Sequence, residues 1–318
     1  MDYRVIAVVV SWNLCDRVLR CVDNLAGAAA VERVIVVDNG SSDGTARVVK
    51  ERFPSVEVIE NEHNIGFAAA ANKGIGRAIE LGADFVLMVN SDVEAPATAV
   101  RRLVVAATEE EAAAVGAKLL RENDPSRLDG AWGIINWRNF ISRVEGEGKP
   151  DGPTYSRRRK VDYPLGAFLL LRAEAIQKVG MFDESYFAYH EEMELCEKLR
   201  RAGFSVVYEP VGVLHGARES VRAAGAQLAR EYLLARNSVR FVRSYGAFLQ
   251  KVKFWSFVVA ASSLKFPAAL IRGALRAHIA NIHGWWDGLL NRPFDRKLQV
   301  RYRLIHPSFD KVNRTEKV

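Results

Sequence analysis

Short apolar runs rich in β-branched residues recur through the first 90 positions, and longer Ala-rich stretches separate them. The runs are VIAVVV (5–10), RVIVVD (33–38), VEVIE (56–60) and DFVLMVN (84–90), and the stretches between them cover about 14–27, 44–53 and 67–82. Continuous apolar strands that alternate with helices predict a parallel sheet with helices on both faces. The predicted fold class is therefore α/β.

Beyond residue 90 the pattern of apolar and polar positions is less regular. Residues 120–160 carry Gly, Pro and charged side chains, including RRRK at 157–160, and are expected to form an irregular excursion. A strand over 163–171, helices over 173–179 and 191–203, and short strands over 204–210 and 211–216 are predicted to follow. From about Ser220 the spacing is helical, which predicts one domain over residues 1–220 and a helical region over residues 221–318.

Charge divides the chain at the same place. Residues 1–220 contain 27 basic against 33 acidic side chains, whereas residues 221–318 contain 18 basic against 5 acidic ones. The basic region favours a partner with phosphates or an anionic membrane surface, although a solvated basic face is the simpler alternative. No nucleic-acid-binding fold or regular aromatic-basic stacking surface is evident, so nucleic acid is not an expected partner.

Residues 247–290 combine apolar and basic side chains at helical spacing. One side of the predicted helix carries Phe248, Val252, Trp255 and Val259, and the basic residues near it are Lys251, Lys253 and Lys265. Such a helix can lie in the headgroup layer of a bilayer, with Trp285 and Trp286 as interfacial anchors. The aromatic residues could instead pack against the first domain. We predict peripheral association with an anionic membrane.

Cysteine spacing and the lengths of the apolar runs exclude other classes. The three cysteines show no CxxC or Cys/His spacing, which argues against a disulfide framework or a zinc site and favours a reducing compartment. VIAVVV is too short for a signal-peptide core, and no run reaches the roughly 18 apolar residues that span a bilayer. The expected location is therefore cytoplasmic, at the inner face of the cell membrane.

Polar loops follow the four predicted strands. They read SWN (11–13), DNGSSDG (38–44), NEHNIGF (61–67) and NSD (90–92). Turn geometry alone favours these residue types, but parallel sheets bind ligands where the carboxyl ends of their strands meet such loops. Neither GxGxxG nor GxxxxGK[ST] is present, which excludes a dinucleotide fingerprint and a phosphate-binding P-loop.

Acidic side chains give these loops a candidate chemistry. Asp38 ends the second strand and could accept hydrogen bonds from a base or ribose, while Asp92 follows the fourth and could bind a hard divalent cation. A cation there would bridge a diphosphate and take up charge that develops as the diphosphate leaves. His215, after a distant strand, is a second candidate ligand, although a histidine in such a place is more often only hydrogen-bonded.

Six motifs in order resemble the family 2 glycosyltransferases, and most closely the rhamnosyltransferase-like enzymes of polysaccharide assembly. They are VVSWN (9–13), VIVVDNGSSDGT (34–45), NIGFAAAANKGI (64–75), LMVNSDVE (87–94), GAFLLLRAEAIQKVGMFDESYFAYHEEMELCEKLRRAGF (166–204) and VLHG (213–216). The similarity covers about residues 4–245. It implies a GT-A fold, in which a Rossmann-like mixed sheet binds a nucleotide-diphosphate sugar at its strand ends, followed here by a C-terminal helical appendage.

The resemblance also implies roles for individual residues. The NSD sequence takes the place of the family's DxD metal motif, so Asp92 would be the carboxylate ligand of a divalent cation, Mg²⁺ or Mn²⁺. The second ligand would be His215. The residues that would contact the nucleotide-sugar are Ser11, Asn13 and Asp38 at the nucleotide, and Gly66, Asn72 and Asn90 beside the sugar and diphosphate.

An acidic pair before a helix supplies the catalytic base in this family. Here the pair is Glu191-Glu192, with Glu192 at the base position and Glu191 as the alternative. A carboxylate close to the acceptor hydroxyl, opposite the leaving diphosphate, would allow a single displacement that inverts the anomeric carbon. Acidic residues at the start of an amphipathic helix also arise without catalysis, because the helix dipole favours them.

The predicted function is that of an inverting, metal-dependent glycosyltransferase. It would transfer a sugar, with rhamnose as the leading candidate, from a nucleotide-diphosphate donor to a lipid-linked or growing glycan. A protein that binds sugar nucleotides or glycans without catalysis is the alternative, because Asn90 removes one charge from the metal motif. A nucleotidyltransferase is disfavoured, since SWNLCDR lacks the Gly-rich phosphate loop that usually follows its first strand.

Overall fold

The computed structural model describes residues 3–137, 141–216, 224–271, 274–302 and 304. Its contacts divide the chain into two compact units. Unit 1 consists of Met1–Ile135, Ser142–Glu184 and Glu191–Ala217, and unit 2 consists of Asn136–Ile141, Ser185–His190 and Arg218–Val318. The predicted boundary between residues 220 and 221 lies outside the described residues and stays a prediction.

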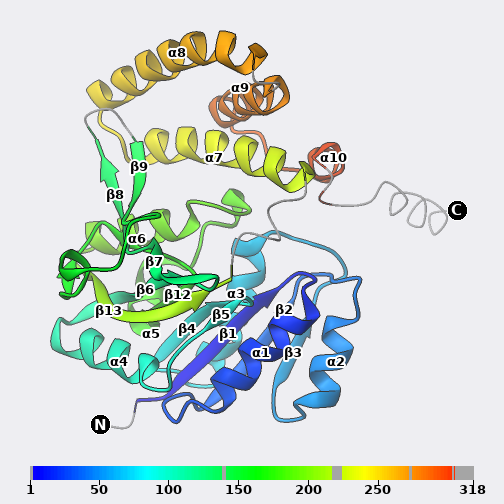
Figure 1. Cartoon of the computed structure of the whole chain (residues 1–318), viewed down its shortest axis with the longest axis vertical. Coiled ribbons are helices and arrows are strands. Elements are labelled where there is room, and N and C mark those ends of the chain that lie inside the picture. Colours follow the sequence, from blue (N-terminus) through cyan, green and yellow to red (C-terminus); the bar gives the residue numbers. More distant parts are fainter. Residues whose placement is uncertain (1–2, 138–140, 217–223, 272–273, 303, 305–318) are drawn as a thin grey trace, which may run out of the picture. The chain divides into compact units, whose positions relative to one another are not determined.

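Unit 1 is built on a ten-stranded mixed sheet (Figure 1). The main path runs β10 (Arg159–Lys160), β13 (Ser205–His215), β6 (Ala112–Arg121), β12 (Phe168–Arg172), β4 (Phe85–Asn90), β1 (Val5–Ser11), β2 (Arg33–Asp38) and β3 (Glu57–Glu60). Two further strands, β5 (Val93–Glu94) and β7 (Asp124–Gly130), pair with β13 and β6. Strands β4, β1, β2 and β3 are parallel, whereas β12 is antiparallel to both its neighbours.

Helices cover both faces of this sheet. They are α1 (Cys15–Ala26), α2 (Thr45–Arg52), α3 (Phe67–Glu80), α4 (Ala99–Glu109), α5 (Ala173–Val179) and α6 (Glu191–Arg201). Val9 of β1 belongs to the core that α1 and α4 share. The neighbouring Val8 points to the opposite face, where a Cβ on Gly74 of α3 would lie only 2.3 Å from its side chain. Glycine at this position therefore lets α3 lie directly on β1.

Residues 120–160 differ from the prediction of an irregular excursion. They contain β7, β8 (Trp132–Asn136) and β9 (Ile141–Glu145), and β8 joins a three-stranded sheet with β9 and β11 (Tyr163–Pro164). The sequence of β7, DPSRLDG, lacks the alternation of apolar and polar residues that reveals a strand in sequence. The two predicted strands over 204–216 are likewise one strand, β13, with a register shift between Glu209 and Gly212 that accommodates Pro210.

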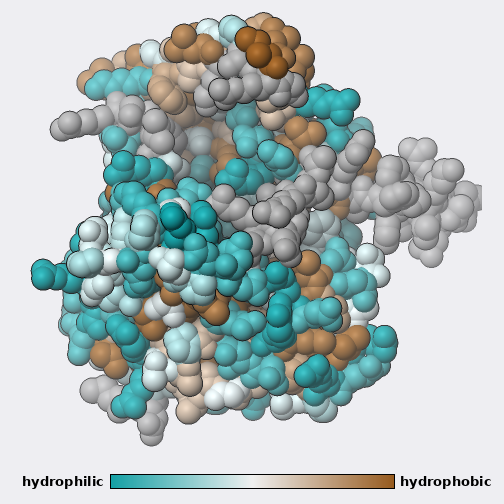
Figure 2. Space-filling view, in the orientation of Figure 1, coloured by the Kyte–Doolittle hydropathy of each residue, from teal (hydrophilic) through white to brown (hydrophobic). Residues whose placement is uncertain are grey.

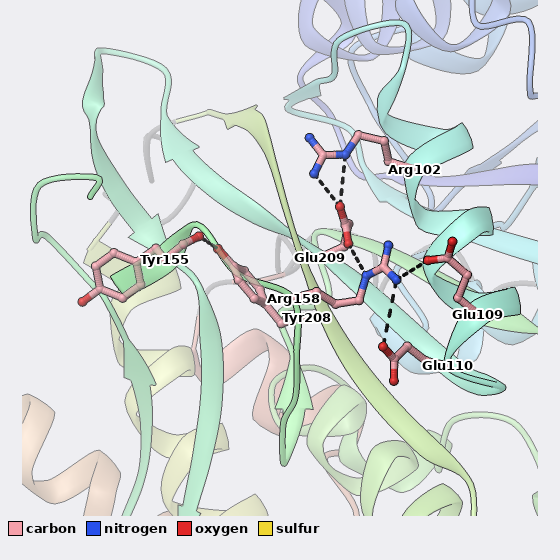
Figure 3. Close-up of polar contacts among 7 residues, drawn as sticks. All are labelled: Arg102, Glu109, Glu110, Tyr155, Arg158, Tyr208 and Glu209. Atoms are coloured by element: carbon pink, nitrogen blue, oxygen red, sulfur yellow. Dashed lines mark hydrogen bonds and ion pairs between the residues drawn. The ribbon is translucent and has the colours of Figure 1, made fainter. Parts of the chain in front are cut away.

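A buried carboxylate fixes β13 to its surroundings. Glu209 is 3% exposed, and its Oε1 accepts hydrogen bonds from the guanidinium of Arg102 on α4 at 2.5 and 3.0 Å. Its Oε2 accepts from Nε of Arg158 at 2.7 Å, and Arg158 also pairs with Glu109 (Figure 3). A charge removed from water this completely needs such partners. The network anchors the strand that ends at His215.

Unit 2 is a set of helices: α7 (Ala224–Tyr245), α8 (Phe248–Ile271), α9 (Leu275–Leu289) and α10 (Arg296–Arg301). Helices α7 and α9 pack closely because α9 presents glycine to α7. A Cβ at Gly284 would lie 2.2 Å from the carbonyl oxygen of Tyr232, and one at Gly288 would lie 2.6 Å from that of Arg236. Among the described helices, none combines the length and apolar character needed to cross a bilayer.

Candidate active site

The register of the sheet brings the polar strand ends to one edge. Ser11 at the end of β1 is the neighbour of Asp38 at the end of β2, and Asp38 is the neighbour of Glu60 at the end of β3. On the other side of β1, Val10 is the neighbour of Asn90 at the end of β4. The loops that follow these strands therefore leave the sheet side by side.

Asp38 lies at the centre of the first loop cluster. It is 3% exposed, and it accepts hydrogen bonds from the hydroxyl of Ser11 at 3.3 Å and from the hydroxyl and backbone N–H of Ser41 at 2.5 and 3.0 Å. Asn13 has a left-handed backbone with φ of 60°, and its Oδ1 accepts from the N–H of Ser42 at 2.9 Å. These contacts shape the loop while leaving Asp38 about one of its four lone-pair positions.

Three buried asparagines join the second and third loops. Asn39 Nδ2 donates to Asn64 Oδ1 at 3.0 Å and to the carbonyl of Gly66 at 3.2 Å, and Asn61 Nδ2 donates to Asn39 Oδ1 at 3.1 Å. Gly66 has φ of 94° immediately before α3, a conformation that favours glycine. The network positions the backbone at the N-terminus of α3. These asparagines were not among the predicted site residues, although each follows a strand.

His215 lies between two carboxylates at the end of β13. Its Nδ1 is 2.8 Å from Oδ2 of Asp129 on β7, and its Nε2 is 3.5 Å from Oδ1 of Asp92 in the turn between β4 and β5. If Nδ1 carries the proton that Asp129 accepts, the lone pair of Nε2 faces the carboxylate of Asp92. Two electron-rich atoms at this separation are stabilised by a positive charge between them.

The surroundings of Asp92 shift the pKa of its carboxyl group. Burial raises the pKa of Asp92 above its ordinary value, while His215 and Arg17 oppose that rise. Arg17 of α1 pairs with Glu122 at 2.8 Å, and a Cβ on Gly216 would lie 2.5 Å from its Nη1 and 2.8 Å from Cβ of Asp92. Arg17 therefore places a fixed positive charge at the same strand ends. Sequence reasoning did not single it out.

The donor atoms at this position fit a hard divalent cation. Across the residues that the structure describes, no group of three or more His, Cys, Asp or Glu side chains is arranged to hold a metal ion. Asp92 and His215 offer one carboxylate oxygen and one imidazole nitrogen, because Asp129 contacts the far side of the ring. Mg²⁺ and Mn²⁺ suit such a sparse set, since they take further ligands from water and substrate phosphates.

The acid pair begins α6. Glu191 is 8% exposed, and both burial and the neighbouring Glu192 hold its pKa well above the ordinary value. Glu192 is less buried, and burial raises its pKa as well. Gly166 lies beside Glu192, since a Cβ built on it would be 3.5 Å from Cβ of Glu192, an ordinary contact distance. The carboxylate of Glu192 and burial both raise the pKa of Tyr163, burial contributing more.

The side-chain amide of Asn72 forms hydrogen bonds within the protein. Its Nδ2 donates to the carbonyl of Phe182 at 2.9 Å and to Oε1 of Glu184 at 3.0 Å, and its Oδ1 accepts from the N–H of Phe182 at 3.1 Å. The structure therefore brings Asn72 together with the segment that precedes the acid pair. Its predicted contact with the sugar stays a prediction.

The sheet, its polar strand ends and the C-terminal helices define an α/β protein of the GT-A type. The chain belongs to glycosyl transferase family 2, since the model of that family matches residues 6–180, more than half of its length. The predicted family membership and fold class are thereby confirmed. Membership also supports a sugar-transferring enzyme.

Comparisons with individual proteins agree with this family assignment. The N-acetylglucosaminyl-diphospho-decaprenol L-rhamnosyltransferase of Mycobacterium tuberculosis is 29% identical over 219 residues, which cover 63% of this chain and 71% of the relative. The pre-mycofactocin glycosyltransferase of the same organism is 29% identical over 227 residues, covering 70% of this chain and 44% of the relative. A crystal structure of GalNAc-T7 with UDP, GalNAc and Mn²⁺ superimposes with a TM-score of 0.59 at 16% identity, covering 76% of this chain and 48% of that one. This last likeness concerns the fold alone.

Proposed function

We propose that the protein is an inverting glycosyltransferase that moves a sugar, rhamnose as the leading candidate, from a nucleotide-diphosphate donor to a lipid-linked or growing glycan. The observation that carries the proposal is the arrangement Asp129–His215–Asp92 at the strand ends. Support for rhamnose and for a lipid-linked acceptor comes from the relative named N-acetylglucosaminyl-diphospho-decaprenol L-rhamnosyltransferase.

Asp92 and His215 would hold the divalent cation. When bound, Mg²⁺ or Mn²⁺ supplies positive charge against the charge that develops on the leaving diphosphate. Asp129 fixes the ring of His215 so that Nε2 is presented toward Asp92. Arg17 adds a permanent positive charge beside the same side chains. Together these residues and the cation would stabilise the negative charge of the leaving diphosphate.

Ser11, Asn13 and Asp38 would bind the nucleotide, Asp38 accepting one hydrogen bond at the position its partners leave open. Gly66 and Asn90 would lie beside the diphosphate and sugar, where Gly66 lets the backbone approach closely. Asn72 would lie beside the sugar as well, and its side chain holds Phe182 and Glu184 in place.

Glu192 is the proposed base that takes the proton from the acceptor hydroxyl. Its raised pKa brings a carboxylate closer to the proton affinity that a general base needs near neutral pH. Glu191 is more deeply buried, and its pKa is raised further by Glu192. We therefore assign Glu191 as the neutral partner, which keeps a second negative charge away from the base.

Thermal unfolding with a panel of nucleotide-sugars tests the proposed donor class. A nucleotide-diphosphate-rhamnose, such as dTDP-rhamnose, should raise the melting temperature more in the presence of Mn²⁺ than in its absence, because ligands that bind only the folded state stabilise it. Sugars presented without a nucleotide are the control. Turnover of the stabilising donor separates an enzyme from a binding protein. Stabilisation by free sugars alone would contradict the proposal.

We also propose that unit 2 binds the surface of an anionic membrane at the inner, cytoplasmic face of the cell. Among the side chains that the structure describes, nearly all the large apolar ones that are exposed belong to helices α8 and α9 and the residue after them: Phe248, Leu249, Val252, Phe257, Val259, Leu264, Phe266, Leu270, Ile271, Ile279, Ile282, Trp286, Leu289 and Leu290. Brown, apolar residues gather over these helices in Figure 2. Such a concentration of exposed apolar side chains usually has a partner.

The charges of these helices favour an anionic lipid surface as the partner. Helix α8 contains no acidic residue, and the single acidic residue of α9, Asp287, is buried and pairs with Arg292. Lys251 and Lys253 lie among the exposed apolar positions of α8. Apolar side chains can enter the headgroup boundary while the lysines reach lipid phosphates.

Vesicle sedimentation tests this surface. The protein should sediment with vesicles that contain phosphatidylserine at low salt. The double variant Lys251→Gln/Lys253→Gln should bind about 30-fold more weakly, because each basic residue near such a surface contributes about 1 kcal/mol. Arg33→Gln/Arg101→Gln removes the same charge from exposed positions of unit 1 and should bind as the parent does. Equal loss in both double variants, or no binding by the parent, would contradict the proposal.

A further inference from the structure

The segment Ser185–His190 leads directly into the acid pair, and its backbone is unusual. Phe187, Tyr189 and His190 have φ of 66°, 67° and 69°, a left-handed conformation that residues with large side chains rarely adopt. A backbone of this kind persists where surrounding contacts determine it. The two residues immediately before Glu191, Tyr189 and His190, therefore both have a strained backbone.

Asn237 of α7 holds this segment through its carbonyl groups. Its side chain is completely buried. Its Nδ2 donates to the carbonyl oxygens of Tyr186, Ala188 and Tyr189 at 3.0, 2.8 and 2.7 Å. The two hydrogens of this amide serve three carbonyls, so one of them is shared, and together these bonds fix the direction of the peptide groups that follow Tyr186, Ala188 and Tyr189.

Arg236 holds the same segment, and Arg236 and Asn237 are together called the clamp. Arg236 too is completely buried, and its Nη1 donates to the carbonyl of Ser185 at 2.8 Å and to Oδ1 of Asn237 at 3.0 Å. Its Nε and Nη2 donate to the carbonyl of Arg292 at 3.1 and 2.8 Å. One turn later, Arg240 donates to the hydroxyl of Ser185. A buried guanidinium is costly unless it is hydrogen-bonded, and these bonds all go to fixed points of unit 2.

We propose that Arg236 and Asn237 are positioning residues for the acid pair. By fixing the carbonyls between Ser185 and Tyr189, they set how the chain enters α6 and therefore where the carboxyl of Glu192 lies. The proposal rests on the proposed function, in which Glu192 is the base. It gives the helical region a part in catalysis in addition to the membrane binding proposed for it.

Steady-state kinetics of the full chain test the clamp. Asn237→Ala should lower kcat about 10- to 100-fold, since small displacements of a catalytic group have effects of this size. The donor KM should stay within about 3-fold of the parent value, because donor binding does not depend on the acid pair. Arg236→Lys, which keeps the charge and loses the planar fork, should lower kcat less. Amide exchange of a peptide covering residues 185–190 should be faster in Asn237→Ala.

Two control variants separate positioning from a loss of stability. Ser238→Ala removes a hydroxyl that bonds within α7 and should behave as the parent does. Tyr302→Phe removes a partly buried hydrogen bond to His283 in the same unit and should lower the melting temperature without lowering kcat. A parent-like kcat in folded Asn237→Ala would overturn the proposal. So would a fall in kcat that Tyr302→Phe reproduces at an equal loss of melting temperature.

The variant Glu192→Gln separates failure of the clamp from failure of the proposed function. If Glu192→Gln is inactive while Asn237→Ala keeps the parent kcat, the clamp proposal alone is wrong. If Glu192→Gln keeps the parent rate, the assignment of the base is wrong. The proposal that Arg236 and Asn237 position this base then fails with it.

Discussion

Replacement of Glu192 by glutamine should lower the rate of sugar transfer by about 10²- to 10⁴-fold, the usual contribution of a general base. Donor affinity should change little, because the side chain acts on the acceptor hydroxyl. The parent rate should also rise with pH and level off, with the midpoint above the ordinary glutamate pKa of 4.5, since burial raises the pKa of Glu192 and only the carboxylate accepts a proton. Steady-state rates across a pH series measure both effects.

Glu191→Gln is the matched control for this prediction. Because the pKa of Glu191 is held well above its ordinary value, its carboxyl keeps its proton to higher pH than an ordinary glutamate, and glutamine resembles a neutral carboxyl in shape and charge. Transfer should therefore remain within about 10-fold of the parent rate. A large loss in Glu191→Gln, together with normal transfer by Glu192→Gln, would reverse the two assignments.

Replacement of Asp92 by asparagine should lower transfer by at least about 100-fold, because it removes the only carboxylate proposed to bind the cation. Added Mn²⁺ should restore part of the rate if the loss is one of affinity, and the Mn²⁺ concentration that gives half the maximal rate should rise. Titration of transfer activity with Mn²⁺ measures this change.

Asp129→Asn gives a graded comparison for that titration. Asp129 contacts the ring of His215 and lies on its far side from Asp92, so its loss should weaken cation affinity by about 10- to 100-fold, less than the loss of Asp92. A parent enzyme whose rate does not depend on divalent cations, or an Asp92→Asn variant with the parent's Mn²⁺ requirement, would exclude the proposed site.

The sequence was sufficient to predict the part of the fold that depends on local pattern. Strands β1, β2 and β4 are buried on both faces and therefore read as uninterrupted apolar runs. The polar residues that end them, among them Ser11 and Asp38, could be placed at one edge of the sheet because parallel strands align their carboxyl ends.

Features that depend on distant partners could not be predicted in the same way. Asp129 is 86 residues from His215, and it lies on a strand that was expected to be irregular. The three carbonyls that Asn237 gathers lie 48 to 51 residues before it, and nothing in the local sequence distinguishes this asparagine from one on a solvated face. The partners of Asn72, Phe182 and Glu184, are 110 and 112 residues away, and no local pattern indicates them.

The most direct test of the proposed centre is a crystal structure of the protein grown with Mn²⁺ and a nucleoside diphosphate. The account predicts an anomalous Mn²⁺ peak about 2 Å from an oxygen of Asp92 and from Nε2 of His215, with diphosphate oxygens among its other ligands. A diphosphate bound away from Asp92, with no Mn²⁺ between that carboxylate and His215, would contradict it.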